Sequence, residues 1–563
     1  MAEDLKRRLR VALIVDDAAQ RSVCWDLIER SKEARNYSIE FLVVQRKTIR
    51  TDASSFPSRL ARYLRPHGLK SLIARIGFLL IERAEKFRLG QAQQYRDFYR
   101  SYPLEDIPLE KVYVQPIISK SGFVFRYAAE DIEKITSRAP DVLIRCGSGI
   151  LRGEILDTAR FGILSFHHAN NEVNRGTPPG FWEVFNEEPS TGFIIQRLTC
   201  ELDGGDVLFR GSVPTTPPYA LNAVRLYLKA NVFMHKLLES IGGRSALPTP
   251  YPKIPYAYPL YRTPALGDQI RYLSKKFARS ANGFIGRVRG KVLRWGVAYQ
   301  FVEDWKSAVL WRSTVIRNPP DRYLADPFVH YRNGSHVCFV EDFDYSRRKG
   351  QISAFQIRRD GYTELGCALR EDFHMSFPFV LEEAGDVYMC PETQAAHEIR
   401  LYKCVSYPLK WELHRVLMRG VNAADTILFK HGGKWWLLTN IDSSESGDHC
   451  SELHVFCADD LDSSNWMPHP MNPVIFDSRR ARNGGLLFDH EGIYRVFQVQ
   501  GFGVYGESMG IARIVELTDA RYEEQVLCSI PPSFFPHLEG THTYSSAGGL
   551  LAIDFLKNET SRG

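Results

Sequence analysis

Hydrophobic and polar positions follow different patterns in the two parts of the chain. In the first part, continuous apolar runs typical of strands buried on both faces alternate with longer amphipathic stretches. The apolar runs span residues 11–17, 38–44, 112–117, 141–146 and 162–168, and helical stretches lie near residues 23–30 and 130–137. This order predicts a doubly wound α/β domain with a mostly parallel sheet, over residues 1–245.

A helical insertion of about residues 50–105 is expected between the second and third strands. Residues 58–64 and 71–88 are rich in Arg and apolar side chains and have helical spacing. We expect them to pack on the sheet edge. The alternative is a membrane-surface helix, because basic amphipathic helices bind anionic lipid.

A linker is predicted over residues 246–294. Its first part, residues 248–264, is rich in proline, and residues 266–294 are basic. The basic stretch is typical of a solvated connector helix, and a membrane-surface role is again the alternative.

Short strands separated by turn signals predict an all-β domain over residues 295–563. Turn pairs stand at Asn333-Gly334, Ala384-Gly385, Gly432-Gly433 and Glu491-Gly492, each between two β-rich runs. Related units recur at intervals of ~50 residues, which is typical of propeller blades. The length fits five blades, with a strand near residues 297–302 completing the last one.

Composition narrows the class of protein. The 563 residues carry 72 Lys+Arg and 66 Asp+Glu, a formal charge of +6, which is too mild to imply nucleic acid. The ten cysteines form no CxxC pair, so we expect free thiols in a reducing compartment and no zinc motif. No apolar run approaches the ~20 residues of a membrane span. A cytoplasmic location is expected.

Three short motifs between residues 141 and 213 carry the chemistry. They are Ser165-Phe166-His167, then Arg175-Gly176, then Leu202-Asp203-Gly204-Gly205. His167 alone would be an ordinary core or surface histidine, and Asp203 alone a turn residue. The adjacent His167 and His168 point to opposite faces of a strand, so no metal is expected there. The motifs together, in this order and spacing, resemble the folate-dependent formyltransferase family, which includes methionyl-tRNA, glycinamide ribonucleotide and amino-sugar formyltransferases.

The resemblance implies a formyl donor, N10-formyltetrahydrofolate, and a role for each motif. His167 would be the acid/base, Asp203 its partner and proton acceptor, and Ser165 the oxyanion donor. The remaining positions follow from the family's layout. The folate would lie against Cys146, Gly147, Gly149, Ile150, Leu202, Gly204 and Gly205, and the acceptor against His168, Asn170, Asn171 and Arg175.

Ser165 departs from the family, which has Asn at this position. A hydroxyl reaches less far than a carboxamide, so Asn170, Asn171 or His168 would have to supply the missing hydrogen bond. Otherwise the domain has lost formyl transfer and kept only binding.

The C-terminal part resembles five-bladed furanosidase-like propellers and the propeller portion of plant glucosamine inositolphosphorylceramide transferases. The residues that carry this resemblance are Ala325-Asp326-Pro327, Pro391-Glu392-Thr393 and Asp425-Thr426. In glycosidases of this architecture, acids on the innermost strands converge at the axis. Asp326, Glu392 and Asp425 are therefore axis candidates, although acids at these places also cap neighbouring blades.

We expect a sugar N-formyltransferase that modifies the amino group of a nucleotide- or lipid-linked amino sugar, with a propeller that binds carbohydrate. A transfer RNA acceptor is disfavoured, because no basic barrel-like domain follows the first one. The alternatives are an inactive folate- and sugar-binding protein, a glycosyl-bond enzyme that uses the propeller carboxylates, and a membrane-associated enzyme. The sequence leaves the oligomeric state open.

Overall fold

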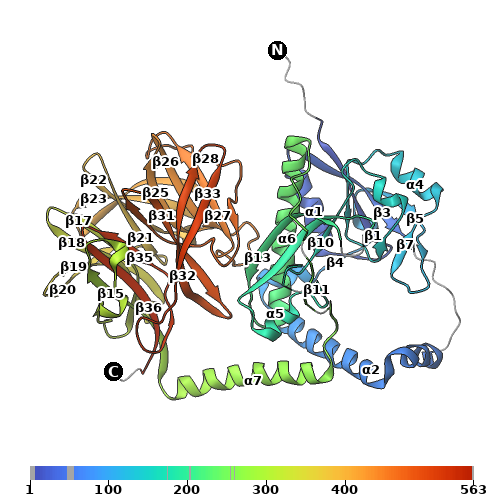
Figure 1. Ribbon diagram of the computed structural model, residues 1–563, viewed down its shortest axis with the longest axis horizontal. Helices are drawn as coiled ribbons and strands as arrows, with labels where there is room; N and C mark the ends of the chain where they lie inside the picture. The colour runs from blue at the N-terminus through green and yellow to red at the C-terminus, as the bar shows by residue number, and fades with distance from the viewer. Residues whose placement is uncertain are drawn as a thin grey trace, which may run out of the picture. The chain divides into compact units, whose positions relative to one another are not determined.

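The computed structural model describes residues 7–46, 56–173, 175–201, 204–253, 255–258 and 260–560. The chain forms two compact units (Figure 1). The first is built from the chain up to Lys275, and the second from Lys276 onward together with residues 188–190 and 213–215.

A seven-stranded sheet organises the first unit. Its strand order is β13-β12-β10-β8-β1-β3-β5. The bounds are β1 (Leu9–Asp16), β3 (Tyr37–Gln45), β5 (Glu110–Val114), β8 (Val142–Arg145), β10 (Ile163–His167), β12 (Ser190–Arg197) and β13 (Asp206–Pro214). The five strands from β10 to β5 run parallel, and β12 is antiparallel to β10. The predicted mostly parallel sheet is therefore confirmed.

The strand order reverses next to β1. The chain builds outward from β1 through β3 to β5, and then returns to add β8 and β10 on the other side. Residues 11–15 of β1 are fully buried, as a strand covered on both faces requires. In sheets of this kind, ligands bind at the carboxyl ends of the strands where the order reverses.

Helices cover the sheet, and α1 and α6 contact each other and β3. The helices are α1 (Ser22–Glu33), α2 (Phe56–Leu89), α3 (Gln93–Arg96), α4 (Ala129–Thr136), α5 (Phe181–Asn186), α6 (Tyr219–Arg244) and α7 (Leu266–Val288). α2 occupies the predicted insertion and has a break in helical geometry at Gly68, whose φ is 70°. Over the described ranges, no helix combines the length and apolarity needed to cross a bilayer.

Short strand pairs complete the first unit: β2 (Gln20–Arg21) with β4 (Ser101–Tyr102), β6 (Ile117–Ile118) with β7 (Val124–Arg126) and β9 (Ile150–Leu151), and β11 (Arg175–Gly176) with β14 (Leu260–Tyr261). β9 lies directly after the loop that follows β8. This pairing therefore anchors the loop against β7.

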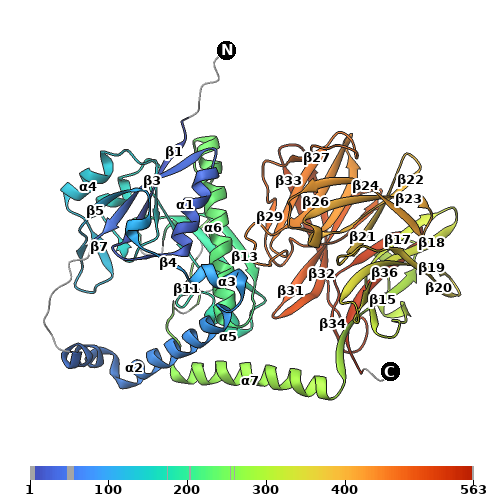
Figure 2. The ribbon, with the colours of Figure 1, turned by 180° about the vertical axis from the view of Figure 1, so that it is seen from behind.

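Five antiparallel sheets make up the second unit, which is all β apart from single 3-10 turns and part of α7 among its described residues (Figure 2). The first contains β17 (Arg322–Arg332), β18 (Ser335–Asp344), β19 (Lys349–Arg358) and β20 (Gly361–Leu369). The second contains β21 (Ser376–Glu383), β22 (Asp386–Glu392), β23 (Glu398–Ser406) and β24 (Lys410–Arg419). The third contains β25 (Ala423–His431), β26 (Lys434–Ile441), β27 (Glu452–Ala458), β28 (Met467–Pro468) and β29 (Ile475–Phe476).

The last two sheets finish the unit. The fourth contains β30 (Asn483–Asp489), β31 (Gly492–Gly501), β32 (Val504–Leu517) and β33 (Tyr522–Ile530). The fifth joins β34 (Leu538–Gly540), β35 (Tyr544–Ala547) and β36 (Leu550–Thr560) to the early strands β15 (Lys291–Phe301) and β16 (Thr314–Ile316). β15 pairs with β36 along its whole length, so the strand near residues 297–302 joins the last sheet, as the sequence predicted.

One strand from each of the five sheets takes part in a closed cycle of contacts. β17 contacts β21, β21 contacts β25, β25 contacts β30, β30 contacts β35, and β35 contacts β17. Side chains that leave these strands inward are therefore brought together from all five sheets.

The turn signals form hairpins for a backbone reason. Asn333-Gly334, Ala384-Gly385 and Gly432-Gly433 each link two strands with positive φ at both positions. This is the type I′ geometry whose twist matches that of paired strands. The fourth hairpin turns at His490-Glu491, one residue earlier than predicted, and Gly492 begins β31.

A fully buried ion pair ties β31 to β33. The Arg495 guanidinium donates to both carboxylate oxygens of Glu524, at 2.9 and 2.7 Å. The Tyr522 hydroxyl also donates to Glu524, at 2.8 Å. Removing one member of a buried pair leaves the other charge without compensation.

Replacing Arg495 with Met is therefore expected to lower the free energy of unfolding by about 3–5 kcal/mol, measured by urea denaturation. The double variant Arg495→Met/Glu524→Leu should recover most of that loss. Arg521→Met is the matched control, because its partner Glu523 is exposed and such pairs contribute less than about 1 kcal/mol. Equal losses for Arg495→Met and Arg521→Met would contradict this account.

Candidate functional site

A cavity of about 380 Å³ opens where the strand order of the first unit reverses. Its wall combines Asp16 at the end of β1, residues 145–148 at the end of β8, and Phe166 and His168 at the end of β10. Cys24 of α1 and Tyr227 of α6 close the other side. The cavity therefore lies where the parallel sheet is expected to bind a ligand.

Asp16 fixes the loop after β8. The Ser148 hydroxyl donates to the Asp16 carboxylate at 2.8 Å, and the Ser148 N–H donates to it at 3.2 Å. The Gln45 amide adds a 3.3 Å bond to the same carboxylate. The end of β1 thus presents a carboxylate to the cavity. In nucleotide-binding sheets, the same place is taken by glycines that approach a phosphate.

Ser165 is buried in β10 beside Arg145 of β8. The two residues are in register across the parallel pair, and Arg145 Nε donates to Ser165 Oγ at 3.2 Å. Arg145 Nη1 donates to the Gly149 carbonyl at 2.6 Å. Burial lowers the pKa of the Arg145 guanidinium. Sequence analysis missed Arg145, because only the strand register shows that it lies beside Ser165.

Arg145 and Ser148 also line a second cavity of about 390 Å³. The other residues of its wall are Ile118, Gly122, Phe123, Phe125, Gly149 and Ile150. Of the predicted folate-binding residues, Gly149 and Ile150 lie here, whereas Cys146 and Gly147 line the first cavity.

The two histidines take different positions. His167 ends β10 opposite Ile194 of β12, and strand alternation puts it on the same face as Ser165. His168 lines the first cavity, and its ring lies 4.0 Å from the ring of Tyr227. Burial, with help from the charges of His167 and Arg145, lowers the pKa of His168 to about 3. The imidazole of His168 is therefore neutral at physiological pH.

Part of the predicted catalytic set falls outside the described residues. Leu202 and Asp203 are not among them, and neither is the side chain of Arg175. Gly204 and Gly205 are described, and the Gly204 carbonyl accepts a 3.1 Å hydrogen bond from the Thr199 hydroxyl. The pairing of His167 with Asp203 stays a prediction.

The two asparagines after β10 have structural contacts. Asn170 Oδ1 accepts the N–H of Glu172 at 3.0 Å and so closes a local turn. The Asn171 amide donates to the Tyr256 hydroxyl at 3.2 Å and accepts from Arg210 at 3.2 Å. The role of both residues in acceptor binding stays a prediction.

A second constellation lies in the second unit, where one backbone irregularity recurs in three sheets. The ladder between the first two strands shifts register at Asp326, at Phe377 and at Asp425. Each of these residues has a φ of +47°. This left-handed conformation costs roughly 1–2 kcal/mol for a residue other than glycine, and such strain is found mainly at functional sites.

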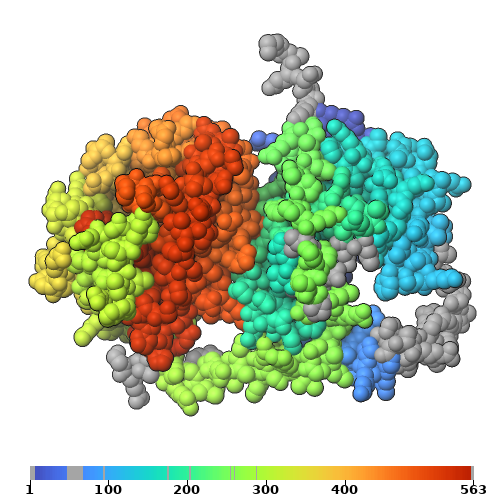
Figure 3. Space-filling view, viewed as in Figure 1, coloured from blue at the N-terminus to red at the C-terminus, as the bar shows by residue number. Residues whose placement is uncertain are grey.

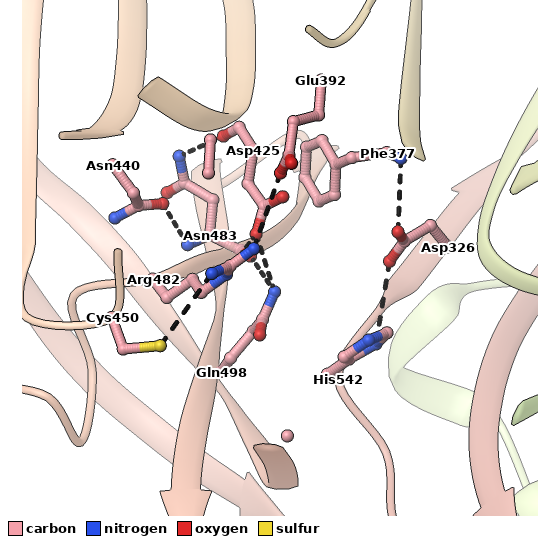
Figure 4. Close-up of polar contacts among 12 residues, drawn as sticks. Asp326, Phe377, Glu392, Asp425, Asn440, Cys450, Arg482, Asn483, Gln498 and His542 are labelled. Atoms are coloured by element: carbon pink, nitrogen blue, oxygen red, sulfur yellow. Dashed lines mark hydrogen bonds and ion pairs between the residues drawn. The ribbon is translucent and has the colours of Figure 1, made fainter. Parts of the chain in front are cut away.

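Asp326 lies among hydrogen-bond donors and a histidine. It accepts from the Thr543 hydroxyl at 2.8 Å and from the Phe377 N–H at 3.2 Å. The Asp326 carboxylate lies 3.7 Å from His542 Nδ1 (Figure 4). His542 also forms a shorter ion pair with Asp554. Burial raises the pKa of Asp326 to about 6, although His542 opposes the shift.

Asp425 lies on the other side of the cluster and is bound by a guanidinium. Arg482 Nε donates to Asp425 at 2.7 Å, and Gln498 donates to the same oxygen at 2.9 Å. Glu392 lies 3.6 Å from Arg482, and burial together with Asp425 raises the pKa of Glu392 well above its usual value. Figure 4 shows Asp425, Glu392 and Arg482 close together and facing Asp326 and His542.

Sequence analysis missed Glu341. It lies opposite Ala325, just as Glu392 lies opposite Ser376 and Asn440 opposite Ala424, so the three occupy equivalent positions in successive sheets. Burial and the charge of Asp326 raise the pKa of Glu341. The sequence repeat of about 50 residues predicted similar sheets, but the equivalence of these three positions follows only from the strand register.

Three buried residues of this cluster could hold a cation. One ligand atom each from Asp326, His542 and Asp554 lies within 4.8 Å of the others. The same geometry also suits a protonated His542 that bridges the two carboxylates without a cation. Asp554 and Asp326 raise the pKa of His542, and burial opposes this shift.

The comparisons divide the chain as its two units do. A family model described as "Glucosamine inositolphosphorylceramide transferase 1, N-terminal" matches residues 308–533. The Arabidopsis thaliana protein of the same name is 32% identical over 210 residues, which are 36% of this chain and 27% of that protein. The Oryza sativa subsp. japonica protein is also 32% identical over 210 residues. The chain spans little more than a quarter of the length of these curated relatives.

The N-terminal part is similar to formyltransferases. Methionyl-tRNA formyltransferase of Ralstonia pickettii is 27% identical over 161 residues, which are 28% of this chain and 46% of that protein. Among solved structures, glycinamide ribonucleotide transformylase 1 from Symbiobacterium toebii has 12% identity and a TM-score of 0.27, and covers 42% of this chain and 89% of its own. A thermostable family-43 glycoside hydrolase has 12% identity and a TM-score of 0.30, with coverages of 37% and 76%.

The lowered pKa of His168 predicts a loss of stability in acid. Above pH 6.5 the residue is neutral in the folded and unfolded states. As the pH falls toward 3, the unfolded chain binds a proton that the folded chain does not, so stability is lost. The loss from this residue reaches about 2 kcal/mol at pH 5.

The variant His168→Phe keeps a ring beside Tyr227 but has no titrating group. We expect it to lose less stability than the unmodified protein between pH 7 and pH 5, measured by urea denaturation at both pH values. Parallel losses in the two proteins would show that His168 is not buried as a neutral ring.

Proposed function

We propose that the chain transfers a formyl group from N10-formyltetrahydrofolate to the amino group of an amino sugar. The observation that carries this proposal is the arrangement at the end of β10. Arg145 donates to Ser165 on the neighbouring strand, and His167 follows two residues later on the same face of β10, within the region similar to formyltransferases. Of these three residues, Arg145 lines both cavities. A transferase function is what both groups of relatives have in common.

The second cavity fits the pterin ring of such a donor. Phe123, Phe125 and Ile118 provide apolar and aromatic surface for a flat heteroaromatic ring. The loop after β8 offers backbone groups beside them, because Gly149 has a φ of 93° and its position leaves no room for a Cβ against Phe125. The donor would supply the activated formyl group, and the chain would orient it.

The first cavity suits a polar acceptor with a cationic amine. The Asp16 carboxylate at its wall attracts an ammonium group, whereas the same carboxylate disfavours a phosphate at this point. Arg21 lines the same cavity and suits an anionic linkage. The name of the plant relatives includes glucosamine, a sugar with an amino group, which supports an amino sugar as acceptor.

The bound ammonium would first lose one proton to solvent to become the neutral amine that attacks. His167 would then take the proton that the nitrogen loses after attack and deliver it to the leaving nitrogen. Arg145 would take the place of the family's asparagine. Its Nε and Nη1 bind Ser165 and Gly149, and neither bond uses Nη2. A guanidinium at this wall can donate a hydrogen bond to the oxygen on which negative charge develops.

The second unit would bind carbohydrate. We propose that its five sheets are the blades of a propeller, which the closed cycle of contacts among one strand from each sheet supports. Gln498 Oε1 and Gln500 Nε2 are buried and lack a hydrogen-bond partner among the described residues. An unpaired acceptor and an unpaired donor on β31 suit the hydroxyl groups of a sugar.

A second candidate function is glycosyl-bond chemistry in this unit. The observation in its favour is the set of buried acids with raised pKa values, Asp326, Glu341 and Glu392, beside the ion-paired Asp425. A carboxyl group kept protonated near neutral pH can act as a general acid. A cytoplasmic location stays a prediction, and the ten free thiols favour a reducing compartment.

Two single variants separate the candidates. We expect His167→Ala to lower kcat for formyl transfer at least ~100-fold, the usual loss on removing a general acid or base, while Asp326→Ala leaves it unchanged. The assay uses N10-formyltetrahydrofolate and a panel of amino sugars, with mass spectrometry for a gain of one formyl group. A chain that formylates no sugar but makes or breaks a glycosyl bond, seen as a mass change of one sugar unit, would favour glycosyl-bond chemistry if Asp326→Ala lost that activity and His167→Ala kept it.

Arg145 has its own test. We expect Arg145→Gln to lower kcat by about 10²–10³ with little change in KM, since the proposed hydrogen bond acts on the developing charge. Arg145→Lys should restore part of the activity, and Arg126→Gln, at an exposed position on β7, is the matched control. An Arg145→Gln variant with normal kcat would remove Arg145 from the mechanism.

A further inference from the structure

From Gly68 onward, where its side chains are described, helix α2 has two apolar faces, and the protein buries one of them. Ala74 and Phe78 are buried against the rest of the first unit. The opposite face carries large apolar side chains at intervals of three, four and seven residues, which place them in one stripe along the helix. The members of this α2 stripe are Leu69 (62% exposed), Ile73 (46%), Ile76 (50%), Leu80 (63%) and Phe87 (71%).

Helix α7 begins with the reverse of the usual arrangement for a soluble helix. Its inward face makes hydrogen bonds, besides the packing of the buried Tyr272 ring against Phe181. The Gln269 amide donates to the Ala74 carbonyl at 2.6 Å, the Tyr272 hydroxyl donates to Glu85 at 2.8 Å, and Lys275 donates to the Phe185 carbonyl at 2.9 Å. The apolar side chains Leu266, Ile270 and Leu273 form an α7 stripe that is exposed.

The two helices are in direct contact. A Cβ on Gly77 of α2 would lie 2.6 Å from the Gln269 amide oxygen, so the glycine allows α7 to approach closely. In both ribbon views, α2 and the start of α7 lie along the same edge of the first unit, away from its large sheet (Figures 1 and 2). The space-filling view shows both helices at the surface (Figure 3).

The charges around the α2 stripe are of one sign. From Leu69 to Leu89, the exposed charged side chains of α2 are Lys70, Arg75, Arg83, Lys86 and Arg88. The two acids of this segment are withdrawn, because Glu85 is buried and Glu82 is ion-paired to Lys86 at 2.8 Å. Apolar side chains bordered by cations complement a surface that is apolar inside and anionic outside, which is a lipid bilayer.

A large cavity lies beside the same helix. It measures about 740 Å³ and is lined by Arg75, Phe78, Leu79, Glu82 and Lys86 of α2, together with residues of α6 and the Thr177–Pro179 segment. Three wall residues, Arg21, Val23 and Tyr227, also line the cavity that holds His168. The two cavities are therefore neighbours, and the walls of the two together extend from α2 to the end of β10.

We propose that the α2 and α7 stripes insert into the interface of an anionic lipid bilayer, so that the 740 Å³ cavity receives an amino sugar carried on a lipid anchor. The docking stands on the surface alone, whereas the identity of the acceptor rests on the proposed formyl transfer. The apolar and aromatic wall of the cavity suits the anchor, and Arg21, Arg75 and Lys86 suit an anionic linkage between anchor and sugar.

Flotation of the full chain with vesicles tests the docking. We expect the protein to float with vesicles made of about two parts phosphatidylcholine and one part phosphatidylglycerol. With vesicles of phosphatidylcholine alone it should remain at the bottom of the density gradient. Raising the salt concentration should reduce flotation, because charge attraction to the lipid is screened. The quadruple variant Leu69→Ser/Ile73→Ser/Ile76→Ser/Leu80→Ser should bind at least tenfold less.

The matched control is Val515→Ser/Val526→Ser/Leu527→Ser, which removes exposed apolar side chains from β32 and β33 and should float like the unmodified protein. Thermal midpoints of both variants check that they fold. Failure of the unmodified chain to float with anionic vesicles, or equal flotation of the quadruple variant, would overturn the proposal. A dimer that dissociates in the quadruple variant would overturn it too, since a second copy would then cover the stripe.

Activity separates this inference from the function on which it draws. The quadruple variant should lose transfer to a lipid-linked acceptor in vesicles at least tenfold, and keep transfer to a water-soluble amino sugar. Flotation without formyl transfer to any acceptor would refute the proposed function and leave the docking intact. Equal use of the lipid-linked acceptor by both proteins would refute the proposed route of the acceptor through α2.

Discussion

The reversal of strand order between β1 and β8 is the constraint on which the first unit's chemistry depends. Parallel strands end at one edge of the sheet, so Asp16, the loop after β8 and the end of β10 meet there although they are far apart along the chain. The register of β8 with β10 then places Arg145 beside Ser165. A one-residue slip of either strand would turn that strand's side chains to the opposite face and separate Arg145 from Ser165.

The second unit reaches its cluster by repetition. In each of three sheets, a residue with left-handed backbone lies at the same bulge, namely Asp326, Phe377 and Asp425. The residue before each bulge pairs with Glu341, Glu392 or Asn440 on the second strand, so these three side chains occupy equivalent positions. Asp425 and Glu392 share the guanidinium of Arg482, whereas Asp326 lies beside His542. Burial raises the pKa of Asp326, Glu341 and Glu392. The regular strands thus surround an interior that combines these carboxyl groups with strained backbone at the three bulges.

Local sequence patterns predicted the strands, helices and hairpin turns well. They could not predict which residues far apart in the chain would lie in contact. Hairpin turns such as Asn333-Gly334 require positive φ at adjacent residues, and this requirement is visible in the sequence. The contact of His542 with Asp326 joins residues more than two hundred positions apart, and no local pattern contains it. The sequence also offered His167 and His168 without showing which of them faces a cavity, and the partner proposed for His167 lies outside the described residues.

The most direct test of the central claim is transfer of label from N10-formyltetrahydrofolate carrying carbon-13 in its formyl group, followed by nuclear magnetic resonance of a glucosamine-containing acceptor. The account predicts that the labelled carbon appears as a formamide on the acceptor nitrogen, at a rate that depends on His167. Label that remains on the donor, or leaves it only as free formate with every amino sugar tested, would contradict the account.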